Sequence, residues 1–215
     1  VIGDSHSIDL YNALRVNTEM PFIVALAQGG CRPGDVRSKS EIKMGYKRCY
    51  YKQVADFLHK HSDFVSHIIF TQNGFTLLEW SWLTHNYETE RGQIEQTKNY
   101  LIQLSKNINT VWIGPQIEPM VDLRKIHPRT GYSPKPDISL IKGIKDLDIF
   151  LTNELLNEDS LTYVSKIKGV DFIFERDFII DGKYTYSDRD HWSSYGEKIF
   201  GARLVNYMNK NLEYY

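Results

Sequence analysis

Short apolar runs alternate along this chain with longer stretches whose apolar residues recur at helical spacing, and this alternation is what most restricts its fold. The runs that resemble strands are residues 1–3, 22–26, 66–71, 110–113 and 170–174. Helices are predicted around residues 8–14, 50–59, 88–106, 138–156 and 193–209, and a short hairpin over 178–186. Strands joined by long helices need crossover connections, which favours a parallel sheet with helices on both faces. We therefore expect an α/β protein, a three-layer α/β/α sandwich with a central, mostly parallel five-stranded sheet.

Composition and charge restrict the classes of function that are compatible with the chain. The chain has 215 residues, of which 41% are hydrophobic, and its 26 basic and 27 acidic residues leave a formal charge of −1. This is the composition of a globular protein of one domain, spanning residues 1–215, and the balanced charge gives no support to nucleic-acid binding. No run approaches the roughly 20 apolar residues of a membrane helix.

The sequence begins at Val1 without an initiator methionine, and residues 1–3 resemble the end of a strand. We expect the chain to be a piece of a larger protein, so that it holds no information on targeting signals upstream.

The two cysteines, Cys31 and Cys49, are 18 positions apart. This spacing permits a disulfide, which would stabilise the fold by about 3 kcal/mol and would indicate an extracytoplasmic compartment. The alternative is two unrelated buried thiols. A zinc site is not expected, because neither a CxxC motif nor a histidine pair accompanies them.

In parallel sheets, ligands bind at the carboxyl ends of the strands, so the residues that follow each apolar run are the candidates for chemistry. The first run is followed by Gly3-Asp4-Ser5, which places a serine where a helix begins. Backbone N–H groups and the helix dipole at that point stabilise developing negative charge. The alternative is that Asp4 or Ser5 only caps the helix.

Two further strand ends carry candidate groups. Gly29-Gly30 follows the second run, where glycine lets backbone approach a ligand. Asn73 follows the third run and offers a side-chain amide as a hydrogen-bond donor. Each is equally compatible with an ordinary turn.

Near the carboxyl end, Asp188 and His191 lie three residues apart, just ahead of the last predicted helix. A carboxylate so placed can hold one imidazole nitrogen and leave the other to accept a proton from a serine. By itself the pair is as compatible with an ion pair or a helix cap. Its occurrence together with Ser5, Gly30 and Asn73, in this order along one sheet, favours catalysis.

These four blocks resemble the SGNH, or GDSL-like, hydrolases, a family with a flavodoxin-like fold named for serine, glycine, asparagine and histidine. The resemblance implies Ser5 as nucleophile, His191 as general base and acid, and Asp188 as the group that orients His191. It implies an oxyanion hole made by the N–H groups of Ser5 and Gly30 and the side-chain amide of Asn73. Gly29 is the rival of Gly30. The third block, Gln72-Asn73-Gly74, departs from the family's GxND, which makes Asn73 the weakest assignment.

A narrower resemblance rests on His6, on Gly30-Cys31-x-Pro33 with a second cysteine downstream, and on the block from Asp188 to Ser193. This pattern is similar to that of the SGNH domains fused to membrane acyltransferase-3 proteins, which O-acetylate bacterial surface polysaccharides. It implies a periplasmic domain of an inner-membrane protein with a Cys31–Cys49 disulfide. It also implies a polysaccharide or lipopolysaccharide acceptor, acetyl-CoA as ultimate donor through the membrane domain, and no cofactor or metal bound directly.

The residues leave other functions open. A carbohydrate esterase would use the same acyl-serine chemistry with water as second nucleophile. A non-catalytic glycan-binding module would keep the fold without the reaction. Four aromatic residues fall in the predicted excursions after the third and fourth strands, Trp80, Trp82, Tyr87 and Tyr132, where they would either stack on sugars or fill a local core. Residues 116–137 are expected to form a surface excursion near the site.

Overall fold

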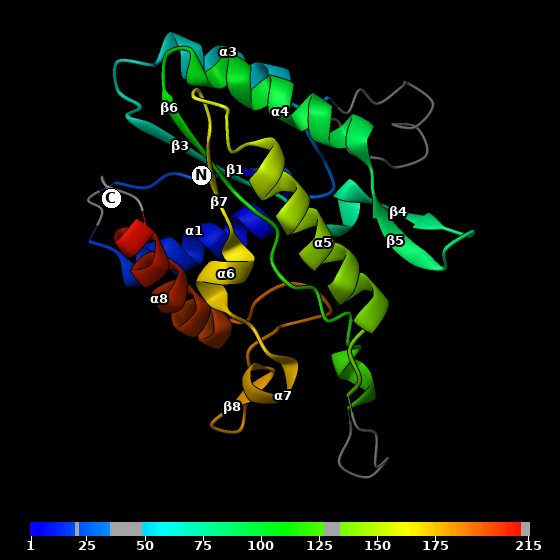
Figure 1. The fold of residues 1–215 in the computed structure, drawn as a ribbon. Helices are drawn as coiled ribbons and strands as arrows, with labels where there is room; N and C mark the ends of the chain where they lie inside the picture. Colours follow the sequence, from blue (N-terminus) through cyan, green and yellow to red (C-terminus); the bar gives the residue numbers. More distant parts are fainter. Residues whose placement is uncertain (20–21, 35–48, 127–133, 212–215) are drawn as a thin grey trace.

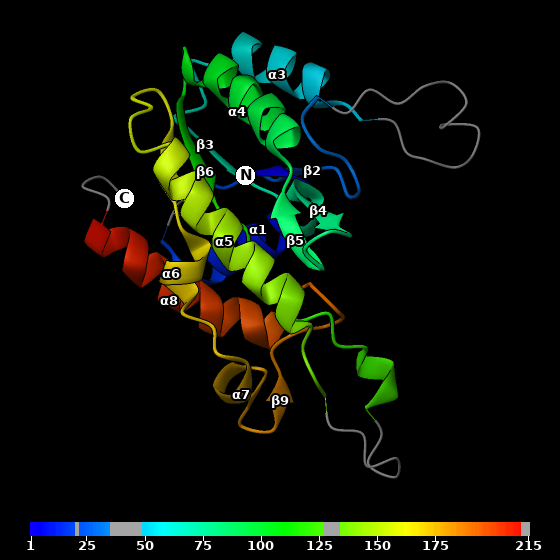
Figure 2. The same cartoon turned by 45° about the vertical axis from the view of Figure 1, so that its right-hand side comes forward.

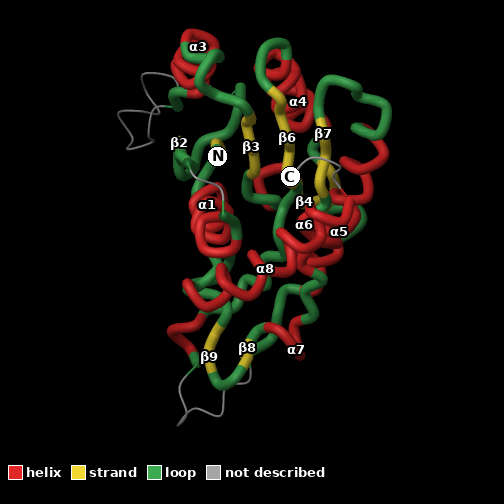
Figure 3. The backbone as a smooth tube through the Cα atoms, turned by 90° about the vertical axis from the view of Figure 1, so that its left-hand side faces the viewer, coloured by secondary structure: helices red, strands yellow, loops and turns green. Residues whose placement is uncertain are grey.

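The computed structural model describes residues 1–19, 22–34, 49–126 and 134–211. Its main sheet contains β1 (Ile2–Gly3), β2 (Leu26–Ala27), β3 (His67–Thr71), β6 (Asn109–Ile113) and β7 (Thr162–Val164). The strands lie in the order β2-β1-β3-β6-β7, and every pair is parallel, so the carboxyl ends of all five share one edge. Figure 3 shows β3, β6 and β7 side by side.

The helices form a layer on each face of this sheet (Figure 1). One layer contains α3 (Tyr51–Lys60), α4 (Arg91–Ser105) and α5 (Ile138–Glu154), and the other contains α1 (His6–Asn17), α6 (Lys166–Val170) and α8 (Ser194–Asn211). Successive residues of a strand point to opposite faces: Ile68 and Phe70 of β3 pack in the first layer's core, and Ile69 packs in the second. The expected three-layer α/β/α sandwich is confirmed.

Two of the five predicted strands were misplaced. The fifth strand is β7 and not residues 170–174: Val170 ends α6, and Asp171 takes a left-handed φ of 49° that stops the helix. The second strand is only Leu26–Ala27, because its partner β1 offers only Ile2 and Gly3 for pairing. Phe22, which we predicted as strand, is 86% exposed.

Among the described residues, the smaller elements outside the main sheet and its two helical layers are two hairpins and three short helical turns. The antiparallel strands β4 (Leu78–Ser81) and β5 (Asn86–Thr89) pack against α5, as Figure 2 shows. They include residues 88 and 89, predicted as helical, because α4 starts only after its cap, Glu90, accepts the N–H groups of Gly92 and Gln93. The predicted hairpin over 178–186 is confirmed by β8 (Ile179–Ile180) and β9 (Lys183–Tyr184). The turns are η1 (Phe75–Leu77), η2 (Leu123–Lys125) and α7 (Phe174–Asp177).

The cysteine pair and the long connection after β6 were also open questions. Cys31 and Cys49 form a disulfide, with their Cα atoms 5.6 Å apart. The prediction that residues 116–137 form a surface excursion is wrong at the start of this segment, because Gln116, Ile117 and Glu118 are all buried. Tyr132 lies outside the described residues. Within the described ranges, no helix combines the length and the apolar character needed to cross a membrane.

Candidate functional site

The turn after β1 presents Ser5 at the first turn of α1. Gly3 has a φ of 149°, and a Cβ there would lie 1.9 Å from the carbonyl oxygen of Thr71, so only glycine fits between β1 and β3. Asp4 is buried, and its carboxylate accepts the N–H groups of His6 at 3.0 Å and of Asn73 at 2.8 Å. Asp4 therefore ties the ends of two strands together and caps the helix. Ser5 makes no capping hydrogen bond with its hydroxyl.

Asp188 and His191 form a hydrogen-bonded pair in the loop before α8. The Asp188 carboxylate oxygens lie 3.1 and 3.0 Å from Nδ1 of His191, and Oδ1 also accepts the His191 backbone N–H at 2.8 Å. Nε2 of His191 is buried and has no hydrogen-bond partner among the described residues. A neutral imidazole held by a carboxylate at Nδ1 carries its proton there, which leaves Nε2 as a base.

The loop before α8 is fixed against the amino-terminal helix. Asp9 of α1 accepts the Trp192 N–H at 3.1 Å, and Gln116 donates from Nε2 to Asp9 at 3.1 Å and to the Asp190 carbonyl at 2.7 Å. As a result, the rings of His6 and His191 lie 5.0 Å apart, centroid to centroid. The residue after the predicted nucleophile thus contacts the predicted base. No hydrogen bond links the Ser5 hydroxyl to His191 in the described structure.

Asn73 lies in the same site, with its side-chain amide held on both sides. Its Oδ1 accepts the Thr76 N–H at 3.2 Å, and its Nδ2 lies 3.0 Å from Nε2 of His6 and 3.2 Å from Oδ2 of Asp190. Both N–H bonds of Asn73 therefore face His6 and Asp190 in this arrangement.

Of the two glycines after β2, Gly29 lies next to Ser5. A Cβ on Gly29 would lie 3.8 Å from the Ser5 Cβ, whereas one on Gly30 would meet no atom within 4 Å. Gly30 has a φ of 73°, which favours glycine. This placement favours Gly29, the rival assignment, as the glycine that contacts Ser5. The role of Gly30 in the oxyanion hole stays a prediction.

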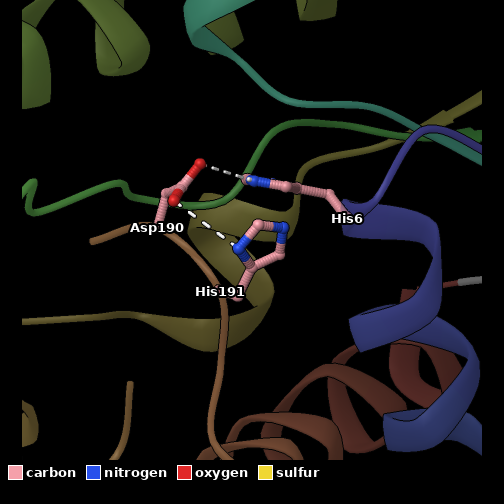
Figure 4. Close-up of side chains that lie close together, drawn as sticks. All are labelled: His6, Asp190 and His191. Atoms are coloured by element: carbon pink, nitrogen blue, oxygen red, sulfur yellow. Dashed lines mark hydrogen bonds and ion pairs between the residues drawn. The ribbon is translucent and has the colours of Figure 1, made fainter. Parts of the chain in front are cut away.

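One group of metal-ligand types occurs among the described residues: His6, Asp190 and His191, whose ligand atoms lie within 4.8 Å of one another. Figure 4 shows the three side chains turned toward each other. Asp190 lies 3.4 Å from Nε2 of His6 and 3.5 Å from Nδ1 of His191. Since these atoms already interact with one another, and Nδ1 of His191 also with Asp188, hydrogen bonding accounts for the cluster. The expectation of no bound metal stays a prediction.

Several charged groups are buried around this site. Burial opposes a charge on His6, but the hydrogen bond to Asp190 and the charges of Glu118, Asp4 and Asp9 outweigh it and raise the pKa of His6 to about 9. Burial raises the pKa of Glu118 to about 7, against the charge of His6 and the N–H of Gly74. Burial lowers the pKa of Lys166 to about 8, although nearby carboxylates favour its charged form.

Sequence reasoning missed several of these residues, among them Gln116, Glu118, Lys166 and Asp190. Gln116 and Glu118 follow β6 and were detectable by the strand-end rule that selected Asn73. Lys166 follows β7, and it donates from Nζ to Thr71 at 3.0 Å, but it was hidden because the fifth strand was misplaced. Asp190 lies inside the block from Asp188 to Ser193 that the sequence analysis singled out. Only Asp188 has the three-residue spacing to His191 that predicts a hydrogen-bonded pair.

Comparisons with known proteins bear on the fold. No family model and no curated protein matches the sequence. Among solved structures, the chain is similar to the periplasmic domain of a lipopolysaccharide acetyltransferase from Salmonella ser. Paratyphi A, with a TM-score of 0.66 and 15% identity over 99% of this chain and 82% of that one. It is also similar to a protein from Streptococcus pneumonia provisionally assigned as a platelet activating factor, with a TM-score of 0.54 and 12% identity over 96% and 81%.

At these identities the likeness concerns the fold and not the activity. The five-stranded parallel sheet, its two helical layers and the order of the elements therefore confirm the fold that the SGNH-like motifs predicted, and this chain shares that fold with the Salmonella acetyltransferase domain.

Proposed function

We propose that this chain is an SGNH-type serine enzyme that transfers an O-acetyl group to a hydroxyl of a bacterial surface glycan. One observation carries the proposal: Asp188 holds Nδ1 of His191, while Nε2 of the same ring is buried, has no hydrogen-bond partner among the described residues, and lies beside the helix start that bears Ser5. A histidine arranged in this way serves as the general base for a nearby serine.

In this mechanism, Nε2 of His191 takes the proton of the Ser5 hydroxyl as Oγ attacks the acyl carbonyl. Asp188 keeps the proton on Nδ1 and stabilises the imidazolium that forms. The oxyanion is stabilised by N–H groups at the start of α1, by a glycine of Gly29-Gly30 and by Asn73. Collapse of the tetrahedral intermediate expels the leaving group, which takes the proton from His191, and leaves an acyl-Ser5.

The second half-reaction decides between transferase and esterase. His191 deprotonates the incoming hydroxyl, from a sugar in a transferase or from water in an esterase, as that oxygen attacks the acyl carbon. The bond to Oγ of Ser5 then breaks, and Oγ takes the proton back from His191. The fold of the Salmonella acetyltransferase domain favours the sugar. By the same analogy, the 215 residues are one periplasmic domain of an inner-membrane protein. A fused membrane domain would supply acetyl groups from acetyl-CoA, and the acceptor would be a polysaccharide or lipopolysaccharide.

Hydrolysis of p-nitrophenyl acetate tests the serine mechanism. We expect Ser5→Ala and His191→Ala to lose about 10⁴-fold in kcat/KM and to melt close to the wild type, because neither side chain is a fully buried structural group. Ser66 and His67 provide matched controls: they form a Ser–His hydrogen bond of 3.0 Å at the start of β3, at the other end of the sheet. Ser66→Ala and His67→Ala should keep full activity.

Near-normal turnover in either Ser5→Ala or His191→Ala would refute the proposal. Wild-type protein that is folded, inactive on esters and able to bind polysaccharide would instead support the glycan-binding module.

A further inference from the structure

His6 is the one residue of the site that is completely buried and also contacts both the predicted oxyanion donor and the loop that holds the base. It follows Ser5 directly, and its Nε2 lies 3.0 Å from Nδ2 of Asn73 and 3.4 Å from Oδ2 of Asp190. The hydrogen carried by Nε2 therefore affects both neighbours.

The orientation of Asn73 is fixed by a separate contact. Thr76 donates its N–H to Oδ1 of Asn73 and its hydroxyl to the Asn73 carbonyl, so Nδ2 is the atom that faces His6 and Asp190. An amide nitrogen has two hydrogens. If Nε2 of His6 is unprotonated, it accepts one of them and Asp190 accepts the other, which leaves none for an oxyanion.

A proton on Nε2 changes this arrangement. Two donors then face each other at 3.0 Å, which is unfavourable, while Nε2–H gains Asp190 as an acceptor. The Asn73 N–H that pointed to His6 loses its acceptor and becomes available to another group.

We propose that His6 is a positioning residue: a proton on its Nε2, shared with Asp190, releases one N–H of Asn73 for the oxyanion. The inference rests on the proposed function. Among the described residues, the titratable groups around His6 are Asp4 in the turn, Asp9 on α1, Glu118 after β6 and Asp190 before α8, with the His191 ring 5.0 Å away and Lys166 of α6 near three of the same carboxylates. The four carboxylates favour the protonated ring, in agreement with the raised pKa of His6.

The pH dependence of kcat tests this role. Nδ1 of His6 is buried without a hydrogen-bond partner among the described residues, so the ring can lose its proton from either nitrogen. If the proton leaves Nε2, wild-type kcat for p-nitrophenyl acetate, with spontaneous hydrolysis subtracted, should fall by up to about 10²-fold above pH 9, the loss expected for one oxyanion donor. Asn73→Ala should lack this alkaline fall, because its amide no longer contributes at any pH. His6→Phe should also lack it, since phenylalanine cannot accept from Asn73, and His67→Phe serves as the matched control. An alkaline fall that persists unchanged in Asn73→Ala would overturn the proposal.

A second measurement covers a failure of His6→Phe to fold and separates this inference from the proposed function. In Ser5→Ala protein labelled with ¹⁵N, the Asn73 side-chain amide signals should shift as His6 titrates, with Nε2 protonated at pH 7. An unprotonated Nε2 at pH 7, or Asn73 signals that ignore the His6 titration, would refute the positioning role whatever the enzyme's activity. If the wild-type protein fails to hydrolyse the ester but the NMR signals behave as predicted, only the proposed function is refuted.

Discussion

The two ends of the main sheet differ in the polarity of the side chains around them. At the carboxyl end, buried polar and charged groups form one connected network around Ser5, Asn73 and His191. At the amino end, a cavity of about 720 Å³ is lined mainly by apolar side chains, among them Val24, Phe57 and Ile68. This cavity is therefore not where the candidate chemistry lies.

The comparison shows that residue types alone do not make a site. The amino end also has a serine and a histidine in contact, Ser66 and His67, but they are exposed and adjacent in sequence. At the carboxyl end, parallel strands bring residues from distant segments to one edge, and α1 adds its amino terminus. At the carboxyl end, the start of α1 and the groups from neighbouring strands can stabilise charge. The Ser66–His67 pair at the amino end lies at no helix start.

The largest effect among the following tests is expected at the carboxyl end. Asn73→Ala should lower kcat for p-nitrophenyl acetate by about 10² to 10³-fold at pH 7, because an oxyanion donor is lost. Thermal unfolding should change little, since Asn73 is only partly buried. Asn86→Ala, on the hairpin strand β5, is the control and should be as active as wild type. Equal rates for the two variants would exclude Asn73 from the oxyanion hole.

At the amino end, a substitution should cost stability and not activity. Ile68 is 2% exposed and packs in the core next to the cavity, so Ile68→Ala should reduce the free energy of unfolding by about 3 kcal/mol. Below the melting transition, its kcat should equal that of wild type. Phe64→Ser, at a side chain that is 89% exposed, should change stability by less than about 0.5 kcal/mol. A large loss of kcat in folded Ile68→Ala would show that the two ends are coupled.

A further effect on stability is a pH dependence that comes from the buried carboxyl of Glu118. Its pKa is raised from 4.5 to about 7, so between these values the folded protein binds more protons than the unfolded one. The contribution of Glu118 to stability is therefore lost as pH rises from about 4.5 to about 7. Glu118→Gln removes it, and the wild-type minus variant difference in unfolding free energy should fall across that window and stay level above it. A difference that rises with pH would contradict the assigned shift.

The sequence predicted the fold where apolar runs were long and where polar residues followed them at once. It singled out Ser5, Asn73 and the Asp188–His191 pair as candidates, because each lies in a short block after or before a clear element. It failed at β7, since three residues leave almost no periodic signal and the more apolar stretch 170–174 competes with them. Only the sheet's pairing decides between the two.

The sequence also could not predict the buried network. His6 and Asp190 are 184 residues apart, and burial and partners determine what they do. Lysine side chains are normally exposed, and the residues next to Lys166 in the sequence do not indicate that it is fully buried. The roles of such residues can be recognised only once the fold shows which distant segments lie together.

Covalent labelling tests the central claim most directly, that Ser5 is activated by His191 at the carboxyl end of the sheet. The protein would be treated with a fluorophosphonate and digested, and the labelled peptide would be identified by mass spectrometry. We predict one label per chain, on Ser5, formed far more slowly in His191→Ala and at the wild-type rate in His67→Ala. A folded protein whose Ser5 stays unlabelled, or is labelled equally fast without His191, would contradict the account.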